Sequence, residues 1–149
     1  MEATLFEIPA IALSQNMSSG DFRERNGDVT RKYAPAIVHA AQVIRKVTQV
    51  SWPRDVLMNV NFPAASKMPV AGIEVTREGR SKLGDEIIEN KDPRGHSYYW
   101  IGARQEASDS PKGTDLHAVQ KGFVSVTPIS LNMTHKPTIK RLKGVFQEN

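Results

Sequence analysis

The sequence contains no cysteine, which excludes disulfide bonds and thiol catalysis and fits a cytoplasmic protein. No apolar run approaches the roughly 18 residues that a membrane-spanning helix needs. The first residues also lack the basic and apolar regions of a secretory signal. The phosphate-binding patterns GxxxxGK[ST] and GxGxxG are absent, as are HExxH and EF-hand patterns. Several common classes of nucleotide, metal and membrane site are therefore excluded.

Charge of one sign is not concentrated anywhere along the chain. The net charge of +4 would suit a polyanionic partner. However, residues 21–60 carry seven basic and four acidic groups, and residues 101–149 do the same. Such mixing is typical of a solvated surface rather than of a binding patch. A small basic nucleic-acid-binding protein is therefore the least favoured function.

The apolar pattern predicts an α/β fold in one domain, the natural count for 149 residues. Ile8 to Leu13 is almost wholly apolar, which is typical of a parallel-sheet strand buried on both faces. Such a strand needs neighbours on both sides and a crossover before it, so the sequence suggests a further unit upstream. Residues 1–7 are expected to form a short helix.

One long helix and two strands follow. Tyr33 to Val50 is predicted to be helical because apolar residues recur on one face and Pro35 occupies the first turn. Val56 to Phe62 alternates between apolar and other residues and is predicted to be a strand. Gly72 to Arg77 is predicted to be a shorter strand, with Ile73 and Val75 pointing inward. A weak apolar stripe with basic residues predicts a helix beginning near Pro137.

Two polar features within these elements are open to a structural or a functional interpretation. His39 lies beside the apolar face of the long helix. It has no second His or acidic partner at i+4, so we expect a partly buried or surface residue rather than a metal ligand. Asn59 and Asn61 share one face of their strand. This pattern favours a hydrogen-bonded structural corner, with a polar crevice as the alternative.

The stretch from Asp92 to Ile129 carries the strongest local signals. Asp92-Pro93-Arg94-Gly95 is a turn signature between two strand-like segments, so residues 85–102 are predicted to form a hairpin. A polar loop follows.

Past the loop, the sequence predicts a short helix and then a strand. Thr114 or Asp115 suits the N-cap of the helix, and Gly122 is expected to end it. The strand is predicted from Phe123 to Thr127, with Pro128 as its end.

This order of elements, together with several short motifs, resembles the SurE family, the stationary-phase survival 5'/3'-nucleotidases. The matching segments, in the family's order and over nearly the whole chain, are Ile8-Pro9-Ala10-Ile11-Ala12, Asn59-Val60-Asn61, Gly72-Ile73, Val75-Thr76-Arg77, Asp92-Pro93-Arg94-Gly95, Tyr99-Trp100-Ile101-Gly102, Gly113-Thr114-Asp115, Ala118-Val119 and Gly122-Phe123-Val124-Ser125-Val126-Thr127-Pro128.

The resemblance implies a partial SurE-like, Rossmann-like sheet with helices. Residues 1–84 and 113–130 would form its core α/β part, residues 85–102 a projecting β-hairpin and residues 131–149 a C-terminal tail. The family's opening strand, which ends in paired aspartates, has no counterpart here. The chain is therefore expected to correspond to the C-terminal portion of such a protein, without the metal-binding half.

The resemblance also implies a nucleoside monophosphate substrate and a divalent cation, Mg²⁺ or Mn²⁺. The family's metal ligands lie before the point at which this sequence begins, so no residue here is assigned to the metal. Gly113, Thr114 and Asp115 resemble a segment at a helix start that could bind a phosphate oxygen, although capping of the helix alone explains these residue types. Asn132 and His135 stand near the family's acidic residue and histidine, but Asn cannot exchange a proton.

Tyr98, Tyr99 and Trp100 could stack on a nucleobase, but consecutive strand residues point to opposite faces. Packing against another subunit explains them better, and we expect a homo-oligomer formed through the hairpin and the tail. Besides a nucleic-acid binder, two functions remain. The chain is either part of a SurE-type phosphatase that is inactive alone, or a non-catalytic oligomerisation module that pairs with a catalytic N-terminal part.

Overall fold

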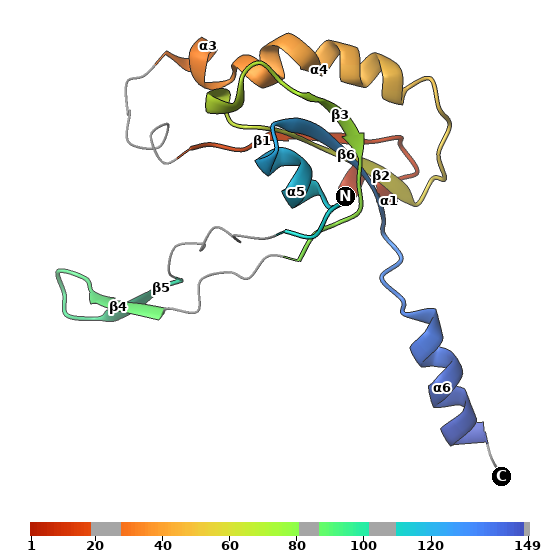
Figure 1. Ribbon diagram of the computed structural model, residues 1–149. Coiled ribbons are helices and arrows are strands. Elements are labelled where there is room, and N and C mark those ends of the chain that lie inside the picture. Colours follow the sequence, from red (N-terminus) through yellow and green to blue (C-terminus); the bar gives the residue numbers. More distant parts are fainter. Residues whose placement is uncertain (19–27, 81–86, 102–109, 148–149) are drawn as a thin grey trace.

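The computed structural model describes residues 1–18, 28–80, 87–101 and 110–147. These residues form a mixed four-stranded sheet, a separate two-stranded hairpin, and helices on both faces of the sheet (Figure 1). The elements in chain order are α1 (Glu2–Leu5), β1 (Ile11–Gln15), α3 (Val29–Lys32), α4 (Ala34–Val47), β2 (Val56–Phe62), the 3₁₀ helix η1 (Ala65–Lys67), β3 (Gly72–Val75), β4 (Ile87–Lys91), β5 (Ser97–Ile101), α5 (Asp115–Gln120), β6 (Phe123–Ser130) and α6 (Lys136–Gln147). The predicted α/β fold is confirmed.

The sheet is built around β2 and β6, which pair antiparallel in the order β1-β2-β6-β3. β1 runs parallel to β2, and β3 runs parallel to β6. The register places Val60 opposite Val126, so the apolar residues of both central strands share one face. This mixed sheet, with helices on both faces, agrees with the Rossmann-like architecture that we expected.

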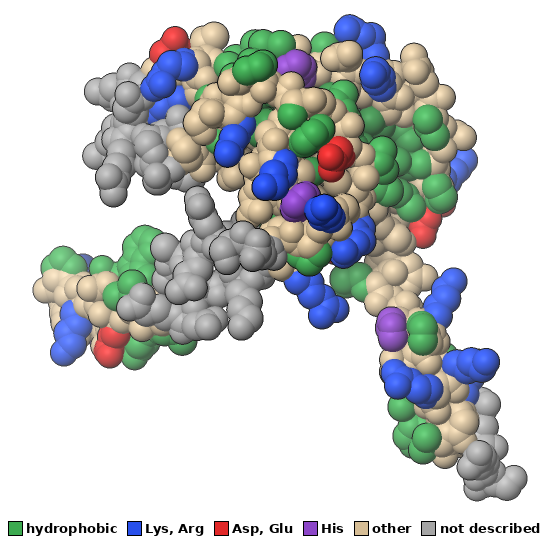
Figure 2. Space-filling model, viewed as in Figure 1, with side chains coloured by type: hydrophobic (Ala, Val, Ile, Leu, Met, Phe, Trp, Pro, Cys, Tyr) green, Lys and Arg blue, Asp and Glu red, His purple; other side chains and the backbone are tan. Residues whose placement is uncertain are grey.

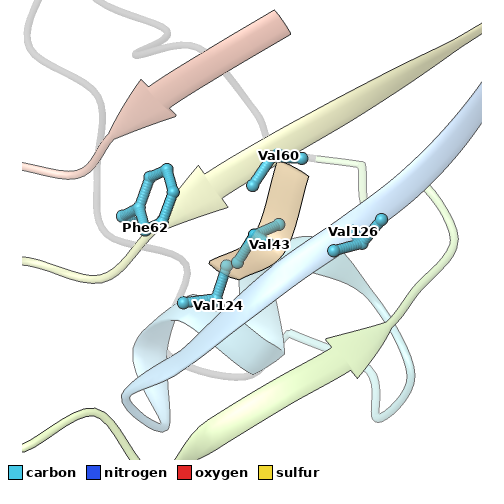
Figure 3. Close-up of a cluster of buried hydrophobic side chains, with 5 residues drawn as sticks. All are labelled: Val43, Val60, Phe62, Val124 and Val126. Carbon is cyan, nitrogen blue, oxygen red and sulfur yellow. The ribbon is translucent and has the colours of Figure 1, made fainter. Parts of the chain in front are cut away.

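One apolar cluster lies between the sheet and α4. Its buried members are Val43 of α4, Val60 and Phe62 of β2, and Val124 and Val126 of β6 (Figure 3). Val43 faces the strands because α4 places an apolar residue every three or four positions, and Ala36, Ala40 and Val47 flank it. Burying a side chain of this size contributes about 1.5–3 kcal/mol, so the cluster is the main apolar contribution to stability.

The structure differs from the sequence prediction at Pro128, which does not end its strand. β6 continues through Pro128 to Ser130 and stays in register with β2. The N–H of Met58, the residue opposite Pro128, bonds to Ala10 of the other neighbour, so the Met58–Pro128 pair is a non-hydrogen-bonded pair. The nitrogen of Pro128 therefore points away from β2, and β3 pairs with β6 only as far as Val126. No ladder hydrogen bond is lost there.

The first strand is also placed differently. β1 spans Ile11–Gln15 rather than residues 8–13, and it lies at an edge of the sheet with β2 as its paired neighbour. Ala12, Leu13 and Ser14 are exposed, so the expected burial on both faces is wrong for this structure. The apolar composition was interpreted correctly as a strand, but it does not decide how many neighbours the strand has.

The outer edge strand β3 departs from prediction in a similar way. Ile73 and Val75 were expected to point inward, yet 36% of Ile73 and 81% of Val75 is exposed. Both lie on the α4 face of the sheet, because their partners in β6 are Val124 and Val126. α4 packs over β1 and the central strands, so this edge of the face stays partly uncovered.

The long helix α4 lies close to its predicted position. α4 has Pro35 in its first turn as predicted, but it ends at Val47 rather than Val50. The side chain of Gln15, at the end of β1, accepts a hydrogen bond from the N–H of Ala36 at 3.1 Å and donates to the carbonyl of Lys32. The first of these bonds supplies a partner for one of the unpaired N–H groups at the start of α4. The short helix α3 was not predicted from the sequence.

Candidate functional site

Thr114 is one of the predicted substrate-binding residues, and its hydroxyl is already engaged. Thr114 is 1% exposed and is the N-cap of α5. Its Oγ1 accepts a hydrogen bond from the N–H of His117 at 3.2 Å and donates to the carbonyl of Pro111 at 2.7 Å. The hydroxyl has one proton, and that proton is used in the hydrogen bond to the carbonyl of Pro111. This geometry supports the capping interpretation.

Asp115 joins the start of α5 to the segment that follows β3. Its Oδ1 accepts hydrogen bonds from the N–H of Gly79 and from the N–H of Leu116, both at 2.8 Å. The N–H of Asp115 donates to the carbonyl of Arg77, and the N–H of Arg77 donates to the carbonyl of Gly113, each at 3.0 Å. We call this group of backbone and carboxylate bonds the hairpin base, because the chain enters and leaves the β4–β5 region here (Figure 1).

Glycine is needed at two positions of the hairpin base. A Cβ on Gly79 would lie 2.9 Å from Oδ1 of Asp115 and 2.9 Å from Cδ1 of Leu116. Gly113 has φ of +78°, a conformation that other residues rarely adopt. The predicted motif Gly113-Thr114-Asp115 thus has a complete structural explanation in this conformation.

Asn132 and His135, the predicted catalytic candidates, lie in the exposed segment between β6 and α6. Oδ1 of Asn132 accepts a hydrogen bond from the N–H of Thr134 at 3.0 Å, and Nδ1 of His135 lies 2.7 Å from Oγ1 of Thr138. These side-chain contacts are local and organise the turn into α6. Asp109, an aspartate of the predicted polar loop and a further polar candidate, lies outside the described residues.

A polar stripe on the α5 face of the sheet was only partly anticipated. Asn61 accepts a hydrogen bond from the Ser14 hydroxyl, which agrees with a hydrogen-bonded structural role. Two neighbouring hydroxyls, Oγ1 of Thr76 and Oγ1 of Thr127, are bonded at 2.7 Å and buried. Ser125 is fully buried, and its hydroxyl has no hydrogen-bond partner among the described residues. The alternation of β6 between Val and Ser or Thr is the sequence signal for this stripe.

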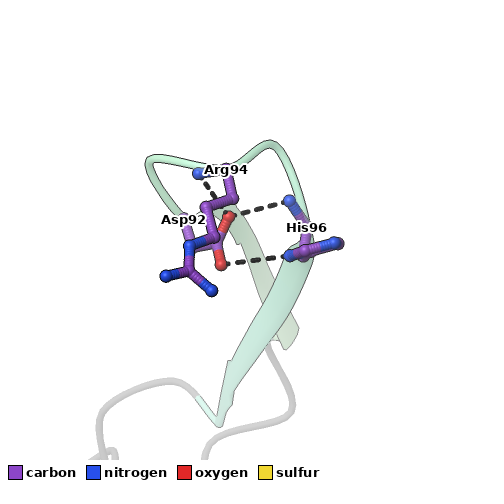
Figure 4. Close-up of polar contacts among 3 residues, drawn as sticks. All are labelled: Asp92, Arg94 and His96. Atoms are coloured by element: carbon purple, nitrogen blue, oxygen red, sulfur yellow. Dashed lines mark hydrogen bonds and ion pairs between the residues drawn. The ribbon is translucent and has the colours of Figure 1, made fainter.

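The hairpin tip is organised by one carboxylate. Oδ1 of Asp92 accepts hydrogen bonds from the N–H of His96 at 2.9 Å and the N–H of Arg94 at 2.8 Å (Figure 4). Oδ2 of Asp92 lies 3.3 Å from Nδ1 of His96. The bond from the His96 N–H is the main reason why the pKa of Asp92 is lowered, and the bonds from the His96 ring, Arg94 and Gly95 add to it.

The hairpin strands themselves are exposed on both faces. β4 pairs with β5 antiparallel, and Tyr98 and Trp100 share one face with ring centroids 6.5 Å apart in an edge-on arrangement. Tyr99 points to the opposite face, as alternation requires. The three aromatic residues therefore do not form one stacking platform.

In the part of the chain that is described, the side chains that could bind a metal ion are not clustered. Residues 1–18, 28–80, 87–101 and 110–147 contain no group of three or more His, Cys, Asp or Glu residues that could hold a metal ion. The divalent cation implied by the resemblance does not fit the residues available here. Among the same residues, no helix is both long enough and apolar enough to cross a membrane.

Comparison with known proteins decides the family. Residues 1–85 match the family described as Survival protein SurE. The chain belongs to the SurE family. It is 44% identical over 146 residues to a protein of Paramagnetospirillum magneticum and 44% identical over 147 residues to one of Rhodospirillum rubrum, each named 5'-nucleotidase SurE. Each match covers 98% of this chain but 53% and 54%, respectively, of the relative.

A solved SurE structure supports the same assignment. The crystal structure of the SurE protein from Aquifex aeolicus matches with a TM-score of 0.68 and 29% sequence identity, over 97% of this chain and 54% of that chain. The chain therefore spans about half the length of the SurE relatives it matches. The predicted resemblance to SurE is confirmed.

We predict that Asp115 stabilises the SurE fold here through the hairpin base. Asp115→Ala leaves the N–H of Gly79 without its carboxylate acceptor and should lower the free energy of unfolding by roughly 1–3 kcal/mol. Asp115→Asn keeps an acceptor oxygen and should recover most of this loss. Urea denaturation measures the stability, and hydrogen exchange at the Gly79 amide reports the bond itself. Unchanged exchange in Asp115→Ala would contradict the role.

A second prediction concerns pH. Because the folded-state pKa of Asp92 lies below its ordinary value of 3.8, the ionised carboxylate stabilises the turn above that pH. This contribution should disappear as the pH falls through the folded-state pKa. The amide chemical shifts of Arg94 and His96 should therefore move together in an acid titration by NMR. Asp92→Asn is the control and should abolish the transition, whereas a transition that persists in this variant would assign it to another group.

Proposed function

We propose that this chain is part of a metal-dependent SurE phosphatase that hydrolyses nucleoside 5'- and 3'-monophosphates. The observation that carries the proposal is 44% identity across 98% of the chain to two proteins named 5'-nucleotidase SurE. The match includes the core strands and the hairpin turn, so it is not limited to a single short motif. Phosphate monoester hydrolysis is the reaction implied by those names.

The cation, Mg²⁺ or Mn²⁺, belongs to the proposal and is not assigned to any residue. Metal ions assist phosphoryl transfer by neutralising charge on the phosphoryl oxygens, which needs several oxygen ligands held in fixed geometry. The described residues offer no His, Cys, Asp or Glu cluster of this kind. We therefore propose that residues beyond these 149 supply the metal site and that the chain is inactive alone.

Five residues of this chain are candidates for a contribution to the reaction. Gly113 and Asp115 belong to the hairpin base and Thr114 lies between them, but the hydroxyl of Thr114 and the Oδ1 of Asp115 make structural hydrogen bonds. Asn132 offers an amide, which cannot act as an acid or base at neutral pH. His135 carries an imidazole, the side chain that most often transfers protons in enzymes.

A second candidate function is a non-catalytic oligomerisation module that pairs with a catalytic N-terminal part. The exposed apolar hairpin and tail favour this alternative. Nucleic-acid binding is not favoured, because basic side chains are scattered among other types on the face shown in Figure 2. A cytoplasmic location, expected from the lack of cysteine, stays a prediction.

The activity prediction follows from the missing ligand cluster. The purified 149-residue chain should release negligible phosphate from nucleoside monophosphates with added Mn²⁺. Activity should appear when the chain is co-expressed with the portion of the Rhodospirillum rubrum relative that it does not match. A colorimetric phosphate assay on several nucleotides, with and without a chelator, measures both. Robust turnover by the chain alone that a chelator abolishes would reveal a metal site within these residues.

We also propose that the hairpin and α6 contribute to a homo-oligomer. Trp100 is 60% exposed and Phe146 is 79% exposed, and α6 extends away from the sheet in Figure 1. Exposed apolar surface of this kind usually meets a partner. Sedimentation at micromolar concentration should therefore show association, and Phe146→Glu with Leu142→Glu should reduce it. Lys140→Glu on the same helix is the control for added negative charge. A monomeric wild-type chain would contradict the proposal.

A further inference from the structure

A groove separate from the hairpin base lies between α4 and the edge strand β3. Its volume is about 290 Å³, and its lining residues are His39, Gln42, Lys46, Val70, Gly72 and Ile73. The first three follow one another at i, i+3 and i+7 and therefore form a stripe along one side of α4. The groove exists because α4 leaves this edge of the sheet partly uncovered, which also explains the exposure of Ile73.

The polar wall of the groove carries donors and positive charge without a compensating acid. None of the lining residues is acidic. Glu74 alternates with Ile73 along β3 and so points to the other face of the sheet. Within the described residues, the side chains of His39 and Lys46 form no hydrogen bond or ion pair. An imidazole has an N–H donor in either protonation state, and the ammonium group has three donors.

The floor of the groove has the opposite character. Val70 and Ile73 present aliphatic side chains, and Gly72 between them has none. A ligand that matches both surfaces needs an anionic group for the Lys46 wall and an apolar part for the floor. Pockets for small molecules commonly combine an apolar surface with a few polar groups in this way, and the volume is near the lower end of their usual range.

We propose that this groove binds a small organic phosphate with a ring system, of which a nucleoside monophosphate is the natural probe. The phosphate would receive charge-assisted hydrogen bonds from Lys46 and His39. Gln42 would bond the polar part of the ligand, and the ring would lie against Val70 and Ile73. The proposal goes beyond the hydrolysis proposed above and does not depend on it, because none of the lining residues is a catalytic candidate.

Binding to the full 149-residue chain can be followed by NMR in the presence of a chelator, so that metal-dependent turnover is absent. AMP should shift the signals of the His39 ring and the Ile73 methyl groups saturably, with millimolar affinity. Inorganic phosphate should bind more weakly and leave Ile73 unchanged. Lys46→Ala should weaken AMP binding roughly two- to fivefold, the range for a solvent-exposed charged contact. Added salt should weaken it as well.

Arg45→Ala is the matched control, because Arg45 is the exposed neighbour of Lys46 and does not line the groove. It should leave AMP affinity unchanged. Equal weakening in both variants would indicate attraction to the overall positive charge and would overturn the proposal. No saturable shift at His39 would overturn it too. Equal affinity for phosphate and AMP would overturn the assignment to an organic phosphate. None of these outcomes bears on phosphate release by the reconstituted SurE protein.

Discussion

The antiparallel pairing of β2 with β6 is the constraint on which the rest of the structure depends. It brings two segments that are more than sixty residues apart in sequence into register, with Val60 opposite Val126. Their apolar side chains then share one face, and Val43 of α4 completes the cluster. A register shift of one residue would turn these side chains to the other face, so the buried cluster and the pairing specify each other.

The two faces of this central pair have different chemistry. The α4 face is aliphatic, whereas the α5 face carries Asn61, Ser125, Thr127 and the bonded hydroxyl of Thr76. α5 packs on β6 with the buried Ala118, and its first turn forms the hairpin base with Asp115. The segment that most resembles a functional motif is thus part of the hairpin base.

Local signals predicted much of this structure. Val56 to Phe62 has the alternation of a half-buried strand and is one, and Asp92-Pro93-Arg94-Gly95 forms the turn that its residue types favour. The predictions were wrong where pairing or packing with another element determines the structure. Pro128 lies inside a strand because its missing N–H faces away from β2, and Val75 is exposed because α4 does not extend over β3. Periodicity describes a segment's own faces but not the elements that cover them.

The roles of the candidate site residues were harder to infer. Thr114 and Asp115 fitted both a cap and a phosphate contact, and only the bonds to Pro111 and Gly79 favour the structural role in this conformation. His39 was expected to be a partly buried or surface residue because it lacks a partner at i+4, and the structure places it partly buried in the groove. Its place in a groove with Ile73 depends on how α4 lies over the sheet, which no local pattern contains.

The position of β6 in the sheet has a consequence for synthesis. β6 is a central strand, yet it comes after the other three strands of its sheet along the chain. Without β6, β2 lacks a partner on one side and β3 has none, and the apolar face of α4 has no complete surface to pack on. Until β6 is synthesised, the nascent chain therefore exposes unpaired strand edges and aliphatic side chains. Such exposed surfaces are the features that chaperones bind. Long-range pairing of this kind also slows folding, because the loop between β2 and β6 must close first.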